Sequence, residues 1–367
     1  MYDNLDNFEP VAKIAVFGVG GAGTNAVNRM IDEDIQNIEF YVANTDKQSL
    51  SLSKTANRII LGHNCTNGLG AGGDPKIGRK AAEESLDYIK EIIQGKDMLF
   101  IAAGMGGGTG TGAAPVIARA AKEMGILTVA IITRPFTFEG NEKSKIAVEG
   151  IAELSKAVDS VIVVSNDKLI MYEGQSSANS AFAKADAILA RSVKTVTDII
   201  MTPYLMNLDF ADVKKTLKDS VVSLIGYGHG SGENKATEAA ESAINCPLLE
   251  TGILGARRCV CGITYGPAVT LIEINQTITK INQLAGNSLN VKFALTCNNE
   301  LEDDILISLI ASDFVNANEI LTGESSNTIV RPVDNSSNSQ DERENEIETE
   351  EIITDFLKDE DINLFNL

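Results

Sequence analysis

A glycine-rich turn at residues 104–112, Gly-Met-Gly-Gly-Gly-Thr-Gly-Thr-Gly, constrains this chain more than any other feature. It follows an apolar run at 98–103 and leads into a helical pattern at 113–124. Glycine raises the entropy cost of folding, so this composition indicates a backbone that needs positive φ or lies against a ligand. Backbone N–H groups, two threonine hydroxyls and a helix dipole all favour an anion here. We therefore expect a phosphate chain at this turn, with a plain flexible loop as the alternative; no lysine follows, so this is not a GxxxxGK[ST] P-loop.

The bulk composition narrows the classes of ligand. A chain of 367 residues, with 44% hydrophobic and 22% charged residues, is typical of a soluble globular protein with about two domains. The formal net charge of −20 argues against a nucleic-acid-binding surface, which needs patches of Lys and Arg. An anionic nucleotide must then be bound mainly by backbone amides, an arrangement that leaves room for Mg²⁺.

The numbers and spacing of cysteine and histidine argue against disulfide, metal and histidine-based chemistry. The five cysteines are scattered without metal-ligand spacing or a disulfide framework, and Cys259 and Cys261 are expected to be buried thiols. Only two histidines are present, which argues against histidine-based acid–base or zinc chemistry. The acidic first ten residues do not resemble a signal peptide, and no apolar run reaches about 18 residues. These features predict a cytoplasmic, reduced protein without direct membrane insertion.

The order of patterned segments predicts an α/β fold. Short apolar runs alternate with amphipathic helices, which is typical of a doubly wound parallel sheet. We expect strands at 11–18, 38–43, 58–61, 98–103, 127–133 and 160–164, and helices at 21–33, 76–93, 110–124 and 141–157. A long helix at about 178–201 carries one apolar stripe, and strands and helices alternate again from about 219.

These patterns predict six segments with different roles. They are a flexible N-terminus (1–10), a nucleotide-binding domain (11–177), a central helix (178–202), a smaller α/β domain (203–318), a disordered acidic linker (319–360) and an apolar C-terminal peptide (361–367). The acidic segment has too little apolar content to order itself, and a short motif on such a tether typically binds a partner.

Three glycine clusters follow predicted strands, at 18–23, 68–73 and 104–112. Because the carboxyl ends of parallel strands meet at one edge of the sheet, we expect the clusters to converge on one site. Gly18, Gly20 and Gly23, with Asp46 at the end of the next strand, also satisfy the dinucleotide fingerprint. An NAD(P)-dependent oxidoreductase is therefore an alternative, but a polyphosphate surrounded by several loops explains all three clusters.

A second group of polar residues, Asn207, Asp209 and Asp212, follows the long helix. Asp209 fits a helix N-cap with Asp212 in the first turn, which is a purely structural interpretation. Alternatively, the two carboxylates position and polarise a water, or sense Mg²⁺, near a phosphate. About 24 helical residues would place them roughly 35 Å from their own nucleotide edge. Such a pair can act only on the nucleotide of a neighbouring subunit, which implies head-to-tail filaments.

These motifs resemble the tubulin/FtsZ family, and FtsZ, its bacterial cell-division branch, in particular. Residues 106–112 fit the signature GGGTG[ST]G, residues 207–212 fit the synergy loop, and the likeness spans about residues 11–315. The resemblance implies a GTP-binding domain, a central helix and an activating domain, with GTP or GDP and Mg²⁺ bound. It also implies protofilaments that form the cytokinetic ring at mid-cell, with each GTPase site completed by the next subunit. A tubulin-like paralogue for plasmid segregation or cell shape remains an alternative.

The resemblance also implies residue roles. It assigns the phosphates to Gly20, Gly21, Ala22, Gly23, Thr24, Asn25, Gly104, Gly106, Gly107, Gly108, Thr109 and Gly110. It places Gly72 and Gly73 near the γ-phosphate, Asn44 and Asp46 beside the phosphates and ribose, and Glu139 by the ribose, with Pro135 and Lys143 also contacting the nucleotide. It assigns guanine to Asn166, Phe182 and Asp186, and hydrolysis in trans to Asn207, Asp209 and Asp212. It indicates no metal-ligand set.

Some positions depart from the family pattern. Lys143 and Asn67 stand where arginine is common, and Lys143 keeps the charge without the planar fork. The C-terminal peptide lacks the usual proline and basic residues, but Leu364 and Phe365 remain as apolar anchors. The expected partners are other copies of the chain and, through this peptide, division-ring and membrane-tether proteins.

Overall fold

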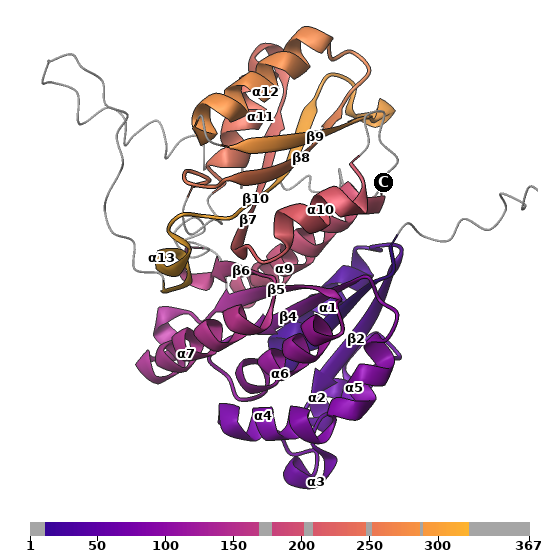
Figure 1. Cartoon of the computed structure of the whole chain (residues 1–367), viewed down its shortest axis with the longest axis vertical. Coiled ribbons are helices and arrows are strands. Elements are labelled where there is room, and N and C mark those ends of the chain that lie inside the picture. The colour runs from indigo at the N-terminus through magenta and orange to yellow at the C-terminus, as the bar shows by residue number, and fades with distance from the viewer. Residues whose placement is uncertain (1–11, 169–177, 202–207, 247–251, 287–288, 323–367) are drawn as a thin grey trace, which may run out of the picture.

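A computed structural model describes residues 12–168, 178–201, 208–246, 252–286 and 289–322 (Figure 1). Within these ranges the strands form one ten-stranded sheet in the order β3-β2-β1-β4-β5-β6-β7-β10-β8-β9. The strands are β1 (Ile14–Val19), β2 (Ile38–Asn44), β3 (Arg58–Ile60), β4 (Met98–Gly104), β5 (Leu127–Arg134), β6 (Ser160–Ser165), β7 (Val221–Gly230), β8 (Arg258–Tyr265), β9 (Asn290–Cys297) and β10 (Ile305–Ser312). Neighbouring strands from β3 to β7 are parallel, as predicted for a doubly wound sheet.

The helices of the first half cover both faces of this parallel sheet. They are α1 (Gly20–Asp32), α2 (Lys47–Ser51), α3 (His63–Thr66), α4 (Pro75–Glu84), α5 (Leu86–Ile93), α6 (Thr109–Glu123) and α7 (Asn141–Ala157), with a 3-10 turn, η1 (Thr137–Glu139). Side chains of β1 alternate between two cores: Phe17 packs into the core that α4 to α7 share, and Val16 into the core beside α1. The sheet is therefore covered on both sides.

One predicted helix is wrong in detail. The segment 76–93 is two helices, α4 and α5, because Ser85 has φ −98° and ψ 8° between them. The Ser85 hydroxyl accepts a hydrogen bond from the backbone N–H of Gly62 at 3.1 Å. This contact with a distant loop could not be found from the helical pattern of 76–93.

The central helix α9 (Ala178–Met201) packs against α1 and the sheet through one stripe, as the pattern predicted. Leu189, Val193 and Val196 on this stripe are fully buried. The helix α10 (Phe210–Leu217) follows it, and Figure 1 shows both between the indigo-to-magenta first half and the orange second half of the chain.

The second half is a smaller α/β unit. β10 pairs antiparallel with β7 and β8, and β8 pairs parallel with the edge strand β9. The other elements are α11 (Lys235–Ile244), α12 (Leu271–Ala285), α13 (Ala317–Thr322), η2 (Gly232–Asn234) and η3 (Asn299–Leu301). α11 and α12 pack side by side on one face of this sheet, and α10 packs on the other. The fold class is as predicted, whereas the domain boundaries stay a prediction, and the expected segments 1–10 and 361–367 lie outside the described residues.

Candidate functional site

The loops after six strands form one continuous arc. A β-carbon built on Gly20 would stand 3.0 Å from the backbone nitrogen of Gly110, and one built on Gly108 would stand 2.8 Å from the β-carbon of Ala71. These contacts join the loops after β1, β3 and β4. The Thr45 and Thr109 hydroxyls, 2.7 Å apart, add the loop after β2.

The loops after β5 and β6 extend the same arc. A β-carbon on Gly106 would stand 3.3 Å from Cγ of Pro135, so the glycine-rich turn lies against the loop after β5. Asp167, after β6, accepts hydrogen bonds from the N–H and the hydroxyl of Thr137, at 2.8 and 2.6 Å. The structure therefore confirms that the loops after these strands converge, as the sequence predicts.

Two sets of glycines on this arc differ in what surrounds them. Gly18, Gly23 and Gly110 are needed for packing, because a β-carbon at each would approach a backbone oxygen within 2.5 Å. Gly21 and Gly107 differ, because their β-carbons would meet no protein atom within 4 Å and neither residue has positive φ. Neither protein packing nor backbone conformation explains these two glycines. Their open faces leave room for a ligand against the backbone.

Two helix N-termini point their orphan N–H groups into the same arc. α1 begins at Gly20 and α6 at Thr109, and neither has a side-chain N-cap or an acidic residue in its first turn. The first four N–H groups of a helix lack partners within the helix, and the helix dipole favours an anion there. The arc is therefore suited to phosphate, as the sequence predicted.

The remaining residues expected at the phosphates lie on the same loops. Thr24 is buried and donates to the carbonyl of Gly20 at 2.8 Å, so its hydroxyl supports the first turn of α1. Gly72 and Gly73 have φ of +58° and +82°, which explains the need for glycine there. Ala22, Asn25 and Gly104, also expected at the phosphates, belong to the same arc. A β-carbon built on Gly104 would stand 2.8 Å from the β-carbon of Ala22.

The Asn44 and Asp46 side chains organise the loop after β2. The Asn44 side chain accepts from the Asp46 N–H at 3.2 Å. The Asp46 carboxylate accepts from the Gln48 N–H at 2.8 Å and the Ser49 hydroxyl at 2.7 Å, and these bonds hold its pKa below the usual value. Asp46 thus caps α2. Thr45, which the sequence analysis did not single out, is buried between them and contacts Thr109.

Two aromatic rings and a buried amide mark the other end of the arc. The half-exposed Phe182 ring meets Phe136 edge-on, with centroids 5.0 Å apart. Asn166 follows β6, and among the described residues its buried side-chain oxygen has no hydrogen-bond partner. A buried acceptor without a donor is costly, so this oxygen is suited to an N–H group of a ligand.

Asp186 lies one helical turn after Phe182, on the same side of α9. Burial raises the pKa of this carboxyl to about 7, and the positive charge of Arg29 on α1 opposes the shift. Arg29 was not singled out by the sequence analysis, and a cation on α1 gives no signal of its closeness to α9. A carboxyl with a pKa shifted by burial is typical of binding-site residues.

Glu139 and Lys143 lie together between the two ends. Lys143 Nζ, in the first turn of α7, donates to Oε2 of Glu139 at the end of η1 over 2.9 Å. Glu139 Oε1 also accepts from the N–H of Phe136 at 3.0 Å, which fixes the carboxylate beside the aromatic pair. Pro135 therefore lies just after β5, Glu139 on η1 and Lys143 in the first turn of α7, on one connected segment.

The expected hydrolytic carboxylates lie elsewhere. Asp209 is the N-cap of α10 and accepts from the Asp212 N–H at 2.8 Å, as the structural interpretation predicted. The 24 residues of α9, about 36 Å of helix, separate α10 from the loops beside Phe182. The structure therefore does not bring Asp209 and Asp212 to the arc of the same subunit. Asn207 lies outside the described residues.

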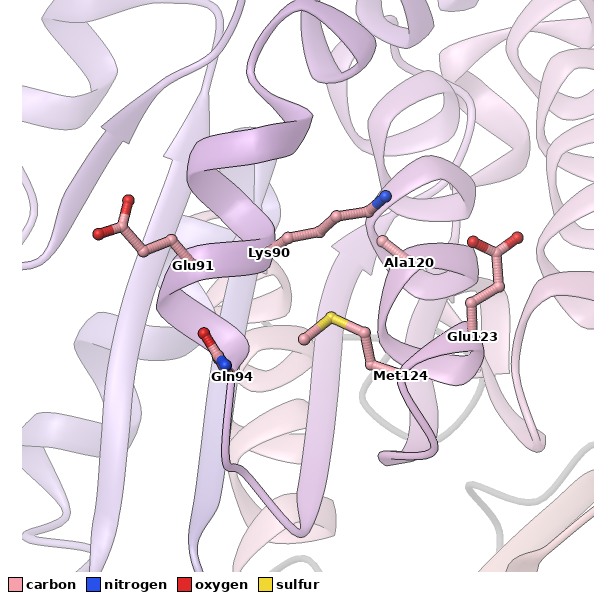
Figure 2. A pocket seen from close by; sticks show the side chains of 6 residues that line it. All are labelled: Lys90, Glu91, Gln94, Ala120, Glu123 and Met124. Carbon is pink, nitrogen blue, oxygen red and sulfur yellow. The ribbon is translucent and has the colours of Figure 1, made fainter.

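A surface hollow of about 440 Å³ lies away from this arc. The last turns of α5 and α6 line it, with Lys90, Glu91, Gln94, Ala120, Glu123 and Met124 (Figure 2). α6 begins at the glycine-rich turn and ends at Glu123, so the hollow lies at the opposite end of this helix. It is not part of the candidate site.

Two other expectations concern metals and membranes. Within the described ranges, no three His, Cys, Asp or Glu side chains gather as a metal site. Cys259 and Cys261 are buried thiols as expected, and burial raises the pKa of Cys259 to about 12. The described helices include none with the length and hydropathy that a membrane crossing requires.

The sequence of this chain matches two protein families and a known relative. Residues 13–173 match the GTPase domain of the Tubulin/FtsZ family, and residues 221–315 match the C-terminal domain of the FtsZ family. The cell division protein FtsZ of Mycoplasmopsis pulmonis is 48% identical over 309 residues, which cover 84% of this chain and 79% of that protein.

Two solved structures with a similar fold belong to FtsZ and CetZ proteins. An FtsZ dimer from M. jannaschii is 38% identical, with a TM-score of 0.76 over 82% of this chain and 88% of its own. CetZ2 from Haloferax volcanii, a GTPγS-bound protofilament, is 20% identical with a TM-score of 0.70 over 84% and 96% of the two chains. At that identity the likeness shows the fold alone.

Proposed function

Because the chain belongs to the tubulin/FtsZ family, as a GTPase of its FtsZ branch, we propose that two adjacent subunits together form each GTP-hydrolysing site. The head-to-tail filament that results would assemble the cytokinetic ring at mid-cell, in the cytoplasm. Family membership sets the oxidoreductase alternative aside, and the FtsZ relative favours cell division over plasmid segregation or cell shape.

One subunit supplies the nucleotide pocket. The phosphates of GTP lie on the N–H groups that open α1 and α6, against the open faces of Gly21 and Gly107. The ribose lies beside Glu139, and the guanine ring stacks on Phe182. Asn166 and Asp186 then accept hydrogen bonds from the N–H groups of the guanine edge, which satisfies the orphan oxygen of Asn166.

The next subunit supplies Asp209 and Asp212. These carboxylates orient a water whose oxygen forms a bond to the γ-phosphorus while the bond from phosphorus to the GDP oxygen breaks. Catalysis of phosphoryl transfer is largely positioning and charge stabilisation, so two carboxylates at a rigid helix start suit the task. The observation that carries this proposal is the length of α9, which separates the carboxylates from the pocket of their own subunit.

Mg²⁺ is proposed to accompany the nucleotide. It prefers oxygen ligands and is commonly held by substrate phosphates with one or two carboxylates, so it needs no cage made by the protein alone. The bound ion would neutralise phosphate charge, which matters in a chain with a net charge of −20. Residues 361–367, outside the described ranges, are proposed to bind division-ring and membrane-tether proteins.

Steady-state GTP turnover against protein concentration tests the shared site. Below a threshold concentration the subunits are isolated, and we expect almost no turnover. Above the threshold the rate should rise linearly, and sedimentation should show polymer at the same concentration. Turnover per subunit that stays constant down to dilute, fully monomeric protein would contradict a site made by two subunits.

A further inference from the structure

We infer that Lys292 positions the carboxylate of Asp212 for hydrolysis on the neighbouring subunit. The inference rests on the proposed function of Asp212 and adds a residue from a different element to that site. Lys292 lies on the edge strand β9, eighty residues after Asp212 in the chain.

The strand register turns Lys292 toward α10. Side chains of β9 alternate between its two faces, and Val291 and Phe293 pack into the core that α11 and α12 cover. Ala294 packs into the opposite core, which includes Val213 of α10. Lys292 shares the face of Ala294, and its ammonium donates to Asp212 Oδ1.

The backbone N–H and carbonyl of Asp212 and one of its carboxylate oxygens each have a hydrogen-bond partner. Its N–H donates to the Asp209 side chain at 2.8 Å, and its carbonyl accepts from the Thr216 hydroxyl at 3.0 Å. Lys292 takes Oδ1, and within the described part of the chain Oδ2 has no hydrogen-bond partner. One carboxylate oxygen is therefore fixed, and the other remains available to accept a hydrogen bond from a water.

A purely structural role for this ion pair is less consistent with the packing. The Asp212 and Lys292 side chains are 29% and 35% exposed, and pairs this open to solvent add little stability. α10 is already fixed to the sheet by the buried Val213 and Leu217 and by the Ser312 hydroxyl, which donates to the Thr216 carbonyl at 2.7 Å. The pair is better explained by a need to orient Asp212.

Lys292→Met tests this role, with Lys280→Met as the matched control. Lys280 is a 29% exposed lysine on α12, where it pairs with Glu241 of α11 on the opposite face of the same sheet. GTP turnover against protein concentration gives two quantities: the threshold, which reports assembly, and the rate per subunit above it, which reports hydrolysis.

For Lys292→Met we expect the rate per subunit to fall by about ten- to a hundredfold, because a 1 Å misplacement of a reacting group can cost about a hundredfold. GTP binding, melting temperature and threshold should match those of Lys280→Met. Lys292→Arg, which keeps a cation and a donor, should recover most of the lost rate. If both Lys292 variants turn over GTP at the rate of Lys280→Met, the inference is wrong.

A double variant shows whether Lys292 acts through Asp212. In Asp212→Asn the residual turnover should not fall further when Lys292→Met is added, because the carboxylate that it orients is gone. An equal loss in both backgrounds would overturn the inference. Failure of the proposed function looks different: wild-type turnover would then show no threshold at all, whatever the state of Lys292.

Discussion

The N–H of Asp212 donates to the carboxylate of Asp209 over 2.8 Å, which ties both acidic side chains to one helix start. Asp209 therefore has a structural role as the cap of α10, whatever else it does. Asp212 does not cap the helix, and among the described residues its Oδ1 accepts a hydrogen bond from Lys292 alone. Substitutions at the two positions should accordingly have different effects on folding.

Asp209→Ala should lower both stability and turnover. Loss of an N-cap typically costs about 0.5–2 kcal/mol, which thermal or urea unfolding can resolve. Asp209→Asn keeps a capping oxygen but loses the charge, so it should unfold like the wild type and still lose turnover. If Asp209→Asn turns over GTP normally, the residue is a cap alone.

Asp212→Ala should keep nucleotide binding and lose turnover. The pocket of its own subunit lies beyond α9, so titration with GTP should give the wild-type affinity. A measured loss of GTP affinity in dilute, monomeric protein would place Asp212 at its own pocket and contradict the shared site.

Gly107→Ala and Gly108→Ala should separate ligand contact from packing. At Gly107 a methyl group meets no protein atom, so the protein without nucleotide should be unchanged or stabilised by about 0.4–1 kcal/mol. GTP affinity should fall, because the methyl group occupies the space proposed for phosphate. Thermal unfolding and GTP titration of the same sample measure the two effects.

Gly108→Ala is the contrasting variant. Its β-carbon would lie 2.8 Å from the β-carbon of Ala71 and 2.9 Å from the backbone nitrogen of Asp74, so the fold itself should be destabilised. Unchanged GTP affinity in Gly107→Ala would show that the open face at this glycine is not the phosphate surface.

Much of the site could be predicted because strand order determines it. Glycine clusters after buried strands must meet once the strands are parallel, and the contact of Gly20 with Gly110 follows from that rule. The capping role of Asp209 could likewise be predicted from local spacing. The guanine-side roles proposed for Asn166 and Phe182 rest on the family resemblance, because single polar and aromatic residues carry no such pattern.

Other features depend on long-range register and could not be predicted. The contact of Lys292 with Asp212 requires β9 to be an edge strand with residue 292 on the face of α10. The break at Ser85 coincides with a hydrogen bond from the distant Gly62, which the local pattern does not show. The raised pKa of Asp186 depends on how deeply α9 packs, and the amphipathic pattern alone does not give that depth.

GTP affinity should rise between pH 6 and pH 8. Burial raises the pKa of Asp186 to about 7 in the protein without nucleotide, so at pH 6 most molecules carry a neutral acid that cannot accept both guanine N–H groups. Ionisation across this range changes the fraction of carboxylate, and hence the affinity, by on the order of tenfold. Equilibrium titration with a fluorescent GTP analogue measures the change.

Asp186→Asn supplies the control, because the phosphates of GTP titrate in the same range but the variant lacks the carboxyl. The raised pKa of Asp186 also makes the free energy of unfolding depend on pH. The raised pKa favours the folded protein at low pH, and this contribution is lost as pH rises through about 7. Without nucleotide, wild type should therefore lose stability relative to Asp186→Asn from pH 6 to pH 8. An identical pH dependence of GTP affinity in both proteins would contradict a guanine contact at Asp186.

Two inactive variants should restore turnover when mixed. Asp212→Ala has an intact pocket and a defective α10, whereas Gly107→Leu has a blocked pocket and an intact α10. In a random equimolar filament, about a quarter of the head-to-tail contacts pair an intact pocket with an intact α10. Turnover should appear on mixing and peak near equal amounts, because each productive contact needs one subunit of each kind. Co-sedimentation of the two variants without any turnover would contradict completion of the site by the next subunit.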